Sequence, residues 1–152
     1  MRLHHYLGRA VGPFLLLFFT IYNHLFRVPR ARVLVWNEKE ELLLVRNWGG
    51  KRQWSLPGGG VKRKERPLEA AKRELYEEVG LNVPLQKFDY VSTFFYQYEA
   101  PIFVVTVAKD DLPIKPHNPR EITDQRWFPS KELPSDLSPL VSIALKYLSK
   151  ND

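Results

Sequence analysis

Cysteine is absent from this chain of 152 residues. Without thiols the protein can form no disulfide bond and can offer no thiolate ligand, so zinc sites built from cysteine are excluded. Any bound metal ion must instead be held by oxygen atoms or by one of the four histidines. The absence of cysteine leaves the redox compartment undetermined.

Acidic residues are fewer than basic ones: 17 Asp and Glu stand against 23 Lys and Arg, giving a net charge of +6. This excess favours polyanionic partners, such as phosphorylated metabolites, nucleic acid or an acidic membrane surface. The hydrophobic content of 44% is sufficient for one sizeable core. The length leaves no room for a second domain of ordinary size.

The chain also lacks a hydrophobic run of clear membrane-spanning length. Residues 10–26 contain no Asp, Glu, Lys or Arg, but Gly, Pro, Asn and His dilute the apolar stretch PFLLLFFTIY. No A-x-A cleavage site marks a signal peptide. Three interpretations remain: a helix docked on the domain, an interfacial membrane anchor, or a true span. We therefore separate residues 1–26 from a domain at 27–152, and expect a cytoplasmic protein, with membrane association through residues 10–26 as an alternative.

Beyond residue 27 the pattern predicts alternating strands and helices, which is typical of an α/β fold. Runs rich in aliphatic, aromatic and β-branched residues predict strands. These runs are Ala31–Trp36, Glu41–Arg46, Phe88–Glu99, Pro101–Ala108 and Asp124–Phe128. The polar NEKE between the first two predicts a hairpin.

Two helices are expected from apolar residues at helical spacing. The first begins at Pro67 and stops at Gly80, although Arg66 stands where a capping Ser, Thr or Asp would be favourable, which predicts slightly weaker initiation. The second follows the cap candidates Ser135 and Asp136.

The first predicted helix collects carboxylates. At about 100° per residue, Glu74 and Glu78 fall within roughly 40° of each other beside the apolar stripe, whereas Glu77 points further out. Like charges one turn apart repel. Either this is a solvated acidic face, or a hard cation such as Mg²⁺, which accepts oxygen ligands, lies between the carboxylates.

The surrounding spacing favours the metal. Five residues separate Gly59 from Glu65, seven more separate Glu65 from Arg73, and Arg73 opens the run RELYEEVGL. This pattern resembles the Nudix hydrolase family at every defined position over Gly59–Leu81, and the preceding LPGG is also usual there. The order of the predicted strands and helices extends the resemblance over 27–150, but not to residues 1–26.

The resemblance implies an α/β/α sandwich around a mixed β-sheet and an enzyme that cleaves a nucleoside diphosphate linked to another moiety. It also implies a bound Mg²⁺, with Mn²⁺ as an alternative. The implied metal ligands are Glu74, Glu78, the carbonyl of Gly59 and, directly or through water, Glu77. The implied structural residues are Glu65, Arg73 and the helix-ending Gly80.

The implied chemistry is attack of water on a phosphorus atom, with a glutamate accepting the proton. Glu74 is the first candidate for this base. Glu121, in the loop before the last predicted strand, is the second, and its alternative role is a salt bridge with Arg120 or Arg126.

Substrate identity is poorly encoded. Basic residues flank the glycine-rich loop, and Lys62, Arg63 and Lys64 within the motif are candidates for binding a phosphate chain; the alternative is a solvated surface. Candidate substrates are nucleoside triphosphates, dinucleoside polyphosphates, nucleotide sugars, ADP-ribose and RNA 5′ ends. A non-catalytic Nudix-fold nucleotide sensor and a membrane-associated scaffold are the alternative functions, and the intact set of carboxylates argues against the sensor. No pattern predicts the oligomeric state.

Overall fold

The structure is a computed structural model that describes residues 28–48, 51–107, 118–119 and 121–151. The apolar segment 1–26, and with it the three interpretations of that segment, lies outside the described residues. Within the described ranges, no helix has both the length and the apolar character needed to cross a membrane.

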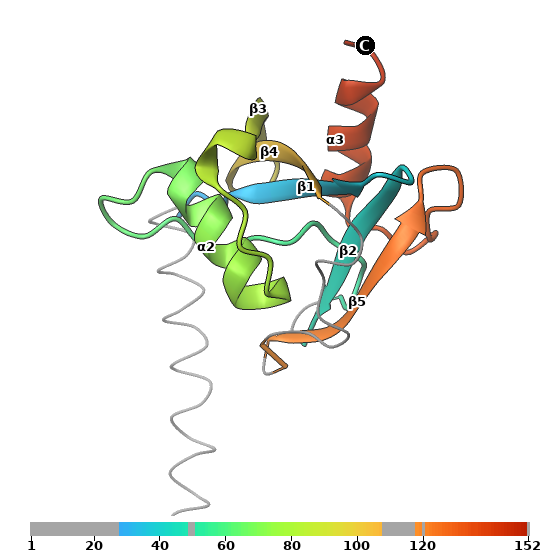
Figure 1. The fold of residues 1–152 in the computed structure, drawn as a ribbon, viewed down its shortest axis with the longest axis horizontal. Coiled ribbons are helices and arrows are strands. Elements are labelled where there is room, and N and C mark those ends of the chain that lie inside the picture. The colour runs from blue at the N-terminus through green and yellow to red at the C-terminus, as the bar shows by residue number, and fades with distance from the viewer. Residues whose placement is uncertain (1–27, 49–50, 108–117, 120, 152) are drawn as a thin grey trace, which may run out of the picture.

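The centre of the fold is a mixed sheet (Figure 1). Its strands are β1 (Arg32–Asn37), β2 (Glu41–Asn47), β3 (Asp89–Phe95), β4 (Glu99–Val107) and β5 (Ile122–Pro129). They lie in the order β3-β4-β1-β2-β5, and only β1 and β4 pair in parallel. The predicted hairpin of β1 and β2 is confirmed, with Trp36 opposite Leu42. The mixed sheet that the resemblance implied is therefore present.

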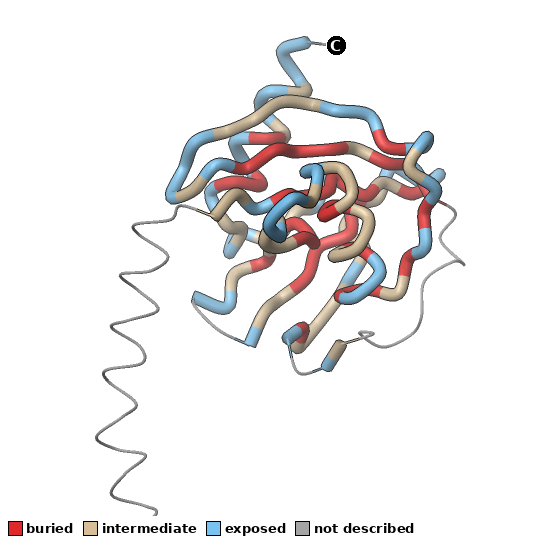
Figure 2. Tube along the Cα trace, turned by 90° about the vertical axis from the view of Figure 1, so that its left-hand side faces the viewer, coloured by how far each residue is buried: buried red, intermediate tan, exposed pale blue. Residues whose placement is uncertain are grey.

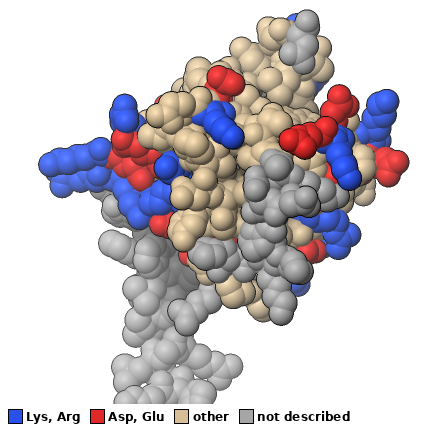
Figure 3. All heavy atoms as spheres, in the orientation of Figure 1, with Lys and Arg blue, Asp and Glu red and all other residues tan. Residues whose placement is uncertain are grey.

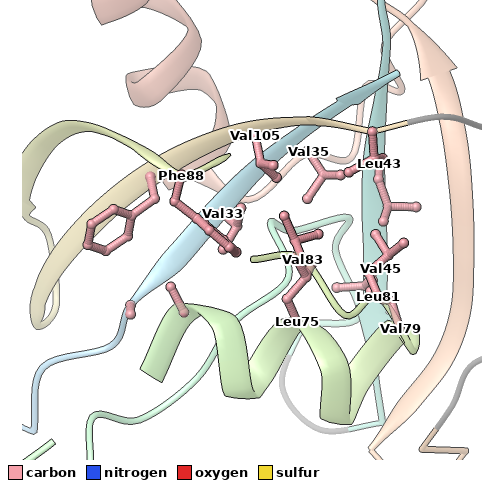
Figure 4. Packing of buried hydrophobic residues seen from close by; sticks show 14 of the residues in the cluster. Val33, Val35, Leu43, Val45, Leu75, Val79, Leu81, Val83, Phe88 and Val105 are labelled. Atoms are coloured by element: carbon pink, nitrogen blue, oxygen red, sulfur yellow. The ribbon is translucent and has the colours of Figure 1, made fainter. Parts of the chain in front are cut away.

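Two helices, α2 (Pro67–Val79) and α3 (Pro139–Leu148), cover opposite faces of this sheet, and a short 3₁₀ helix, η1 (Leu85–Lys87), follows α2. Side chains alternate along each strand, so Val33 and Val35 pack with Leu75 of α2, whereas Leu34 packs with Leu140 of α3. Figure 4 shows the first of these clusters. Most residues of β1 and β2 are buried, and Figure 2 shows buried stretches inside the domain with exposed stretches around them. The predicted α/β/α sandwich is confirmed.

The start of α2 shows how the unfavourable cap is offset. Glu69, in the first turn, accepts hydrogen bonds from the backbone N–H of Arg66 at 3.1 Å and from its guanidinium at 2.7 Å. The carboxylate thus neutralises the charge of Arg66 and satisfies a free N–H. The helix ends at Gly80 as predicted, because the glycine adopts φ 78° and its N–H reaches Tyr76 O.

The predicted start of the second helix is wrong by a few residues. Helix α3 begins after Ser138 rather than after Ser135 or Asp136. Tertiary contacts take these residues: the Asp136 carboxylate binds Arg46 at 2.5 Å, and its carbonyl accepts the N–H of Trp54 at 3.0 Å. Ser138 N–H in turn donates to Trp54 O at 2.8 Å. The segment therefore stays non-helical until Pro139.

Candidate active site

A cavity of about 590 Å³ opens where the glycine-rich loop, helix α2 and the start of β5 meet. It brings together four of the residues predicted from the sequence, namely Gly59, Glu74, Glu78 and Glu121. The other lining residues are Arg30, Arg32, Asn47, Trp48, Gly58 and Gly60. Residues separated widely in the chain thus share one site, with carboxylates and arginines both present.

Glu78 forms the buried part of this site. Its side chain is 4% exposed, and one carboxylate oxygen accepts the N–H of Gly58 at 2.7 Å. Burial raises the pKa of Glu78 to about 7, against the lowering influence of the Gly58 N–H and of Arg32. The charges of Glu74 and Glu121 raise this pKa further. Glu78 therefore lies close enough to both of these carboxylates to be repelled by them.

Arg32 is a site residue that the sequence analysis missed. It is 7% exposed and donates hydrogen bonds to the carbonyls of Leu56, at 3.1 Å, and of Gly58. Gly58 is therefore held on both sides, by Glu78 at its N–H and by Arg32 at its C=O. The available signal was a charged residue inside the otherwise apolar run ARVLVW.

Arg73 links the glycine-rich loop to helix α2. Its guanidinium binds Glu65 at 2.8 Å, Glu74 at 2.6 Å and the carbonyl of Gly60 at 2.9 Å. The hydrogen bonds to Glu65 and Glu74 raise the pKa of Arg73. The hydrogen bond between Arg73 and Glu65 also lowers the pKa of Glu65. Such an arrangement fits the structural role expected for Arg73 and Glu65.

Four of the residues predicted to bind metal or substrate do not line the cavity. Glu77 is 47% exposed and binds Arg73 at 3.0 Å on the helix surface. Lys62, Arg63 and Lys64 are exposed on the loop before α2. Figure 3 shows basic side chains projecting from this end of the molecule with acidic side chains beside them. Any contribution of these cations to binding therefore acts from outside the cavity.

The donor set fits a hard divalent cation. Glu74, Glu78 and the glycine backbone offer only oxygen ligands, which Mg²⁺ prefers, and Mg²⁺ usually keeps several waters or phosphate oxygens. A Cβ on Gly59 would lie 2.5 Å from the Glu74 carboxyl carbon, so the loop backbone directly faces this carboxylate. Across the described part of the chain, no three Asp, Glu, His or Cys side chains are gathered tightly enough to form a metal site by themselves. Water and substrate oxygens would have to complete the coordination.

Comparison with known proteins gives a match to the NUDIX domain family over residues 26–149. The mRNA-decapping enzyme subunit 2 of Arabidopsis thaliana is 31% identical over 104 residues, covering 66% of this chain and 28% of that protein. An RNA pyrophosphohydrolase of Psychromonas ingrahamii is 34% identical over 73 residues, covering 48% and 40%. Each match spans less than half the length of the curated relative.

Solved structures show the same fold. A MutT NUDIX hydrolase from Burkholderia pseudomallei superimposes with a TM-score of 0.68 at 20% identity, covering 80% of this chain and 97% of that one. An Ap4A hydrolase from C. elegans gives a TM-score of 0.63 at 19% identity, covering 80% and 96%. At these identities the likeness concerns the fold alone.

Proposed function

The chain belongs to the Nudix hydrolase family, and from that membership we propose that it hydrolyses the pyrophosphate bond of a nucleoside diphosphate derivative. The observation that carries the proposal is the shared cavity of Glu74, Glu78 and Glu121 beside the glycine-rich loop. The relatives' names, which include RNA pyrophosphohydrolase, mRNA-decapping enzyme and Ap4A hydrolase, support nucleotide or RNA 5′-end substrates.

Nudix hydrolases generally use divalent metal ions. In this chain Glu74, Glu78 and the Gly59 carbonyl would hold Mg²⁺, with Mn²⁺ as an alternative. Glu77, which Arg73 binds at the surface, would contribute through a water molecule. When bound, the ion neutralises phosphate charge and lowers the pKa of coordinated water. The buried position of Glu78 and its raised pKa support this assignment, because a cation would offset the cost of ionising a carboxylate there.

The proton acceptor is best assigned to Glu121. One oxygen of Glu74 is engaged by Arg73 at 2.6 Å, whereas Glu121 is exposed at the cavity and forms no ion pair with any residue in the described ranges. Its expected alternative partner Arg126 pairs with Asp124 at 3.6 Å, and Arg120 lies outside those ranges. The backbone of Glu121 is fixed, because its carbonyl accepts the Trp48 N–H at 2.9 Å.

This assignment predicts different kinetics for two isosteric variants. Glu121→Gln should lower kcat by about 10²–10⁴-fold and leave the Mg²⁺ concentration for half-maximal activity unchanged. Glu74→Gln should raise that Mg²⁺ concentration, because a ligand oxygen loses its charge. Steady-state rates across a Mg²⁺ titration separate the two effects. The reverse pattern would make Glu74 the base.

The proposed function itself is tested by a hydrolysis screen with product identification. Nucleoside triphosphates, dinucleoside polyphosphates, nucleotide sugars, ADP-ribose and capped or triphosphorylated RNA are each incubated with Mg²⁺. We expect cleavage of at least one at its anhydride, lost in excess chelator and restored by added Mg²⁺. If nothing is cleaved although nucleotides bind, the non-catalytic sensor is the better description.

The exposed loop cations should act by attracting substrate over a distance. Replacing Lys62, Arg63 and Lys64 with glutamine should lower kcat/KM about three- to tenfold at low salt, and more for longer phosphate chains than for shorter ones. The effect should fade as ionic strength rises, because exposed charges are screened. The control replaces three other exposed lysines, namely Lys87, Lys146 and Lys150. A salt-insensitive loss, equal for all substrates, would indicate a damaged loop instead.

A further inference from the structure

A second cavity, of about 250 Å³, lies against the active-site cavity. Arg32 and Asn47 line both of them, so the two spaces meet at these side chains. Lys51 and Arg52, in the loop after β2, line the second cavity. Tyr98, which immediately precedes β4, also lines it. The proposed hydrolysis assigns no role to this space.

The charged side chains that line the second cavity, as far as the structure describes them, are all cationic. Three cationic side chains, Arg32, Lys51 and Arg52, line it, and none of its lining residues in the described part of the chain carries a carboxylate. The active-site cavity, by contrast, contains Glu74, Glu78 and Glu121. A ligand that carries negative charge is therefore favoured in the second cavity, and the low exposure around Arg32 strengthens the attraction.

Arg32 and Asn47, which line both cavities, use only part of their hydrogen-bonding capacity on other described residues. Arg32 forms no ion pair with any residue in the described ranges; its donors reach the carbonyls of Leu56 and Gly58, and Tyr98 Oη only weakly at 3.4 Å. The side-chain oxygen of Asn47 is buried without a hydrogen-bond partner in the same ranges. Turning this amide to present its NH₂ group to a ligand would therefore break no hydrogen bond of that oxygen.

We propose that the second cavity binds a phosphate group of the substrate that lies beyond the two phosphates joined by the cleaved bond. The proposal rests on the proposed function, since it extends the same substrate across Arg32 and Asn47. Phosphate suits the site because several hydrogen-bond donors and cations line it, and no acidic side chain does so among the residues that the structure describes. The group could belong to a longer 5′ phosphate chain or to the first internucleotide linkage of an RNA; both present the same anionic oxygens.

The experiment measures binding rather than turnover, so a failure of the proposed hydrolysis does not affect its outcome. Calorimetric titrations use methylene-bridged, non-cleavable probes with Mg²⁺ in excess. One arm compares bridged pyrophosphate with bridged tripolyphosphate. The other arm compares α,β-methylene ADP with the same nucleotide carrying a 3′-methyl phosphate diester, which mimics the first internucleotide linkage without the second nucleoside. Each pair isolates the contribution of one additional phosphate from one of the two sources.

The test variant is Lys51→Gln with Arg52→Asn. Arg52 has φ 51°, a conformation that asparagine tolerates well, and Arg32 is left intact because it holds the loop carbonyls. The matched control, Lys39→Gln with Lys131→Gln, removes the same charge from exposed positions that line neither cavity. Both proteins should keep the thermal stability of the wild type.

In the wild type and the control, the additional phosphate should improve affinity about tenfold in at least one arm, as expected for a charge-assisted contact. In the test variant this gain should fall to about twofold or less, whereas the shorter probes should bind as before. The arm that shows the gain identifies the source of the phosphate. No gain in either arm of the wild type would overturn the proposal. An equal loss of affinity for short and long probes would also overturn it, because the cations would then act only as a general field.

Discussion

Replacing Glu78 with glutamine is expected to reduce turnover at least a hundredfold while the protein stays folded. The variant keeps the shape of the side chain and an oxygen for the Gly58 N–H, which now lies 2.7 Å from the carboxylate. It removes the negative charge that the proposed metal site needs at its most buried position. Initial rates with the best substrate of the screen, at saturating Mg²⁺, measure the effect.

The same variant should change the stability of the metal-free protein in a pH-dependent way. Burial raises the pKa of Glu78 from 4.5 to about 7. At a pH between these two values the carboxyl group is protonated in the folded state and ionised in the unfolded state. Stability of the wild type therefore falls as pH rises from about 4.5 to 7, and the full cost remains above 7. Glutamine carries no such cost. The variant should thus be more stable at pH 8, by an amount on the order of 3 kcal/mol, and similar to the wild type near pH 4.

Thermal unfolding in chelator at both pH values measures this difference. The control is Glu77→Gln one position earlier, where the side chain is 47% exposed and the stability change should be small at either pH. Wild-type turnover in Glu78→Gln would remove Glu78 from the proposed site. An unchanged stability at pH 8 would mean that the carboxylate is solvated better than its burial indicates.

Replacing Gly58 with alanine is expected to destabilise the whole domain. The glycine has φ +130°, which other residues rarely adopt, and a Cβ there would lie 2.2 Å from the carbonyl oxygen of Ala31. That oxygen belongs to the backbone at the start of β1, so it cannot move aside without disturbing the sheet. We expect a loss of about 3 kcal/mol or more, corresponding to a fall of roughly 10 °C in Tm.

The two neighbouring glycines provide graded controls. In Gly59→Ala the added methyl would meet the end of the Glu74 side chain at 2.5 Å, so activity should fall much more than stability. In Gly60→Ala the nearest atom is Val28 Cγ1 at 3.8 Å, an ordinary contact, and both properties should change little. Thermal unfolding and kcat/KM of the three variants test this order. Equal stability of all three would show that the loop does not depend on its contact with β1.

The sequence alone was sufficient for the strands, the acidic helix and the family. Short apolar runs placed β1 and β2 to within one residue at each end, and Gly80 ended α2 where a left-handed residue was expected. These features depend on neighbours a few positions apart, so local patterns carry them. The glutamate spacing likewise predicted that Glu74 and Glu78 would share a site, because one helical turn brings them to the same side.

Tertiary structure decided what depended on distant partners. Asp136 does not cap α3 as predicted, because its carboxylate binds Arg46, which is far away in the chain. Arg32 is part of the site because β1 packs against the glycine-rich loop. This packing brings the Arg32 guanidinium to the carbonyl of Gly58 and near the carboxylate of Glu78. No local pattern encodes these contacts, since each depends on how the sheet brings separate segments together.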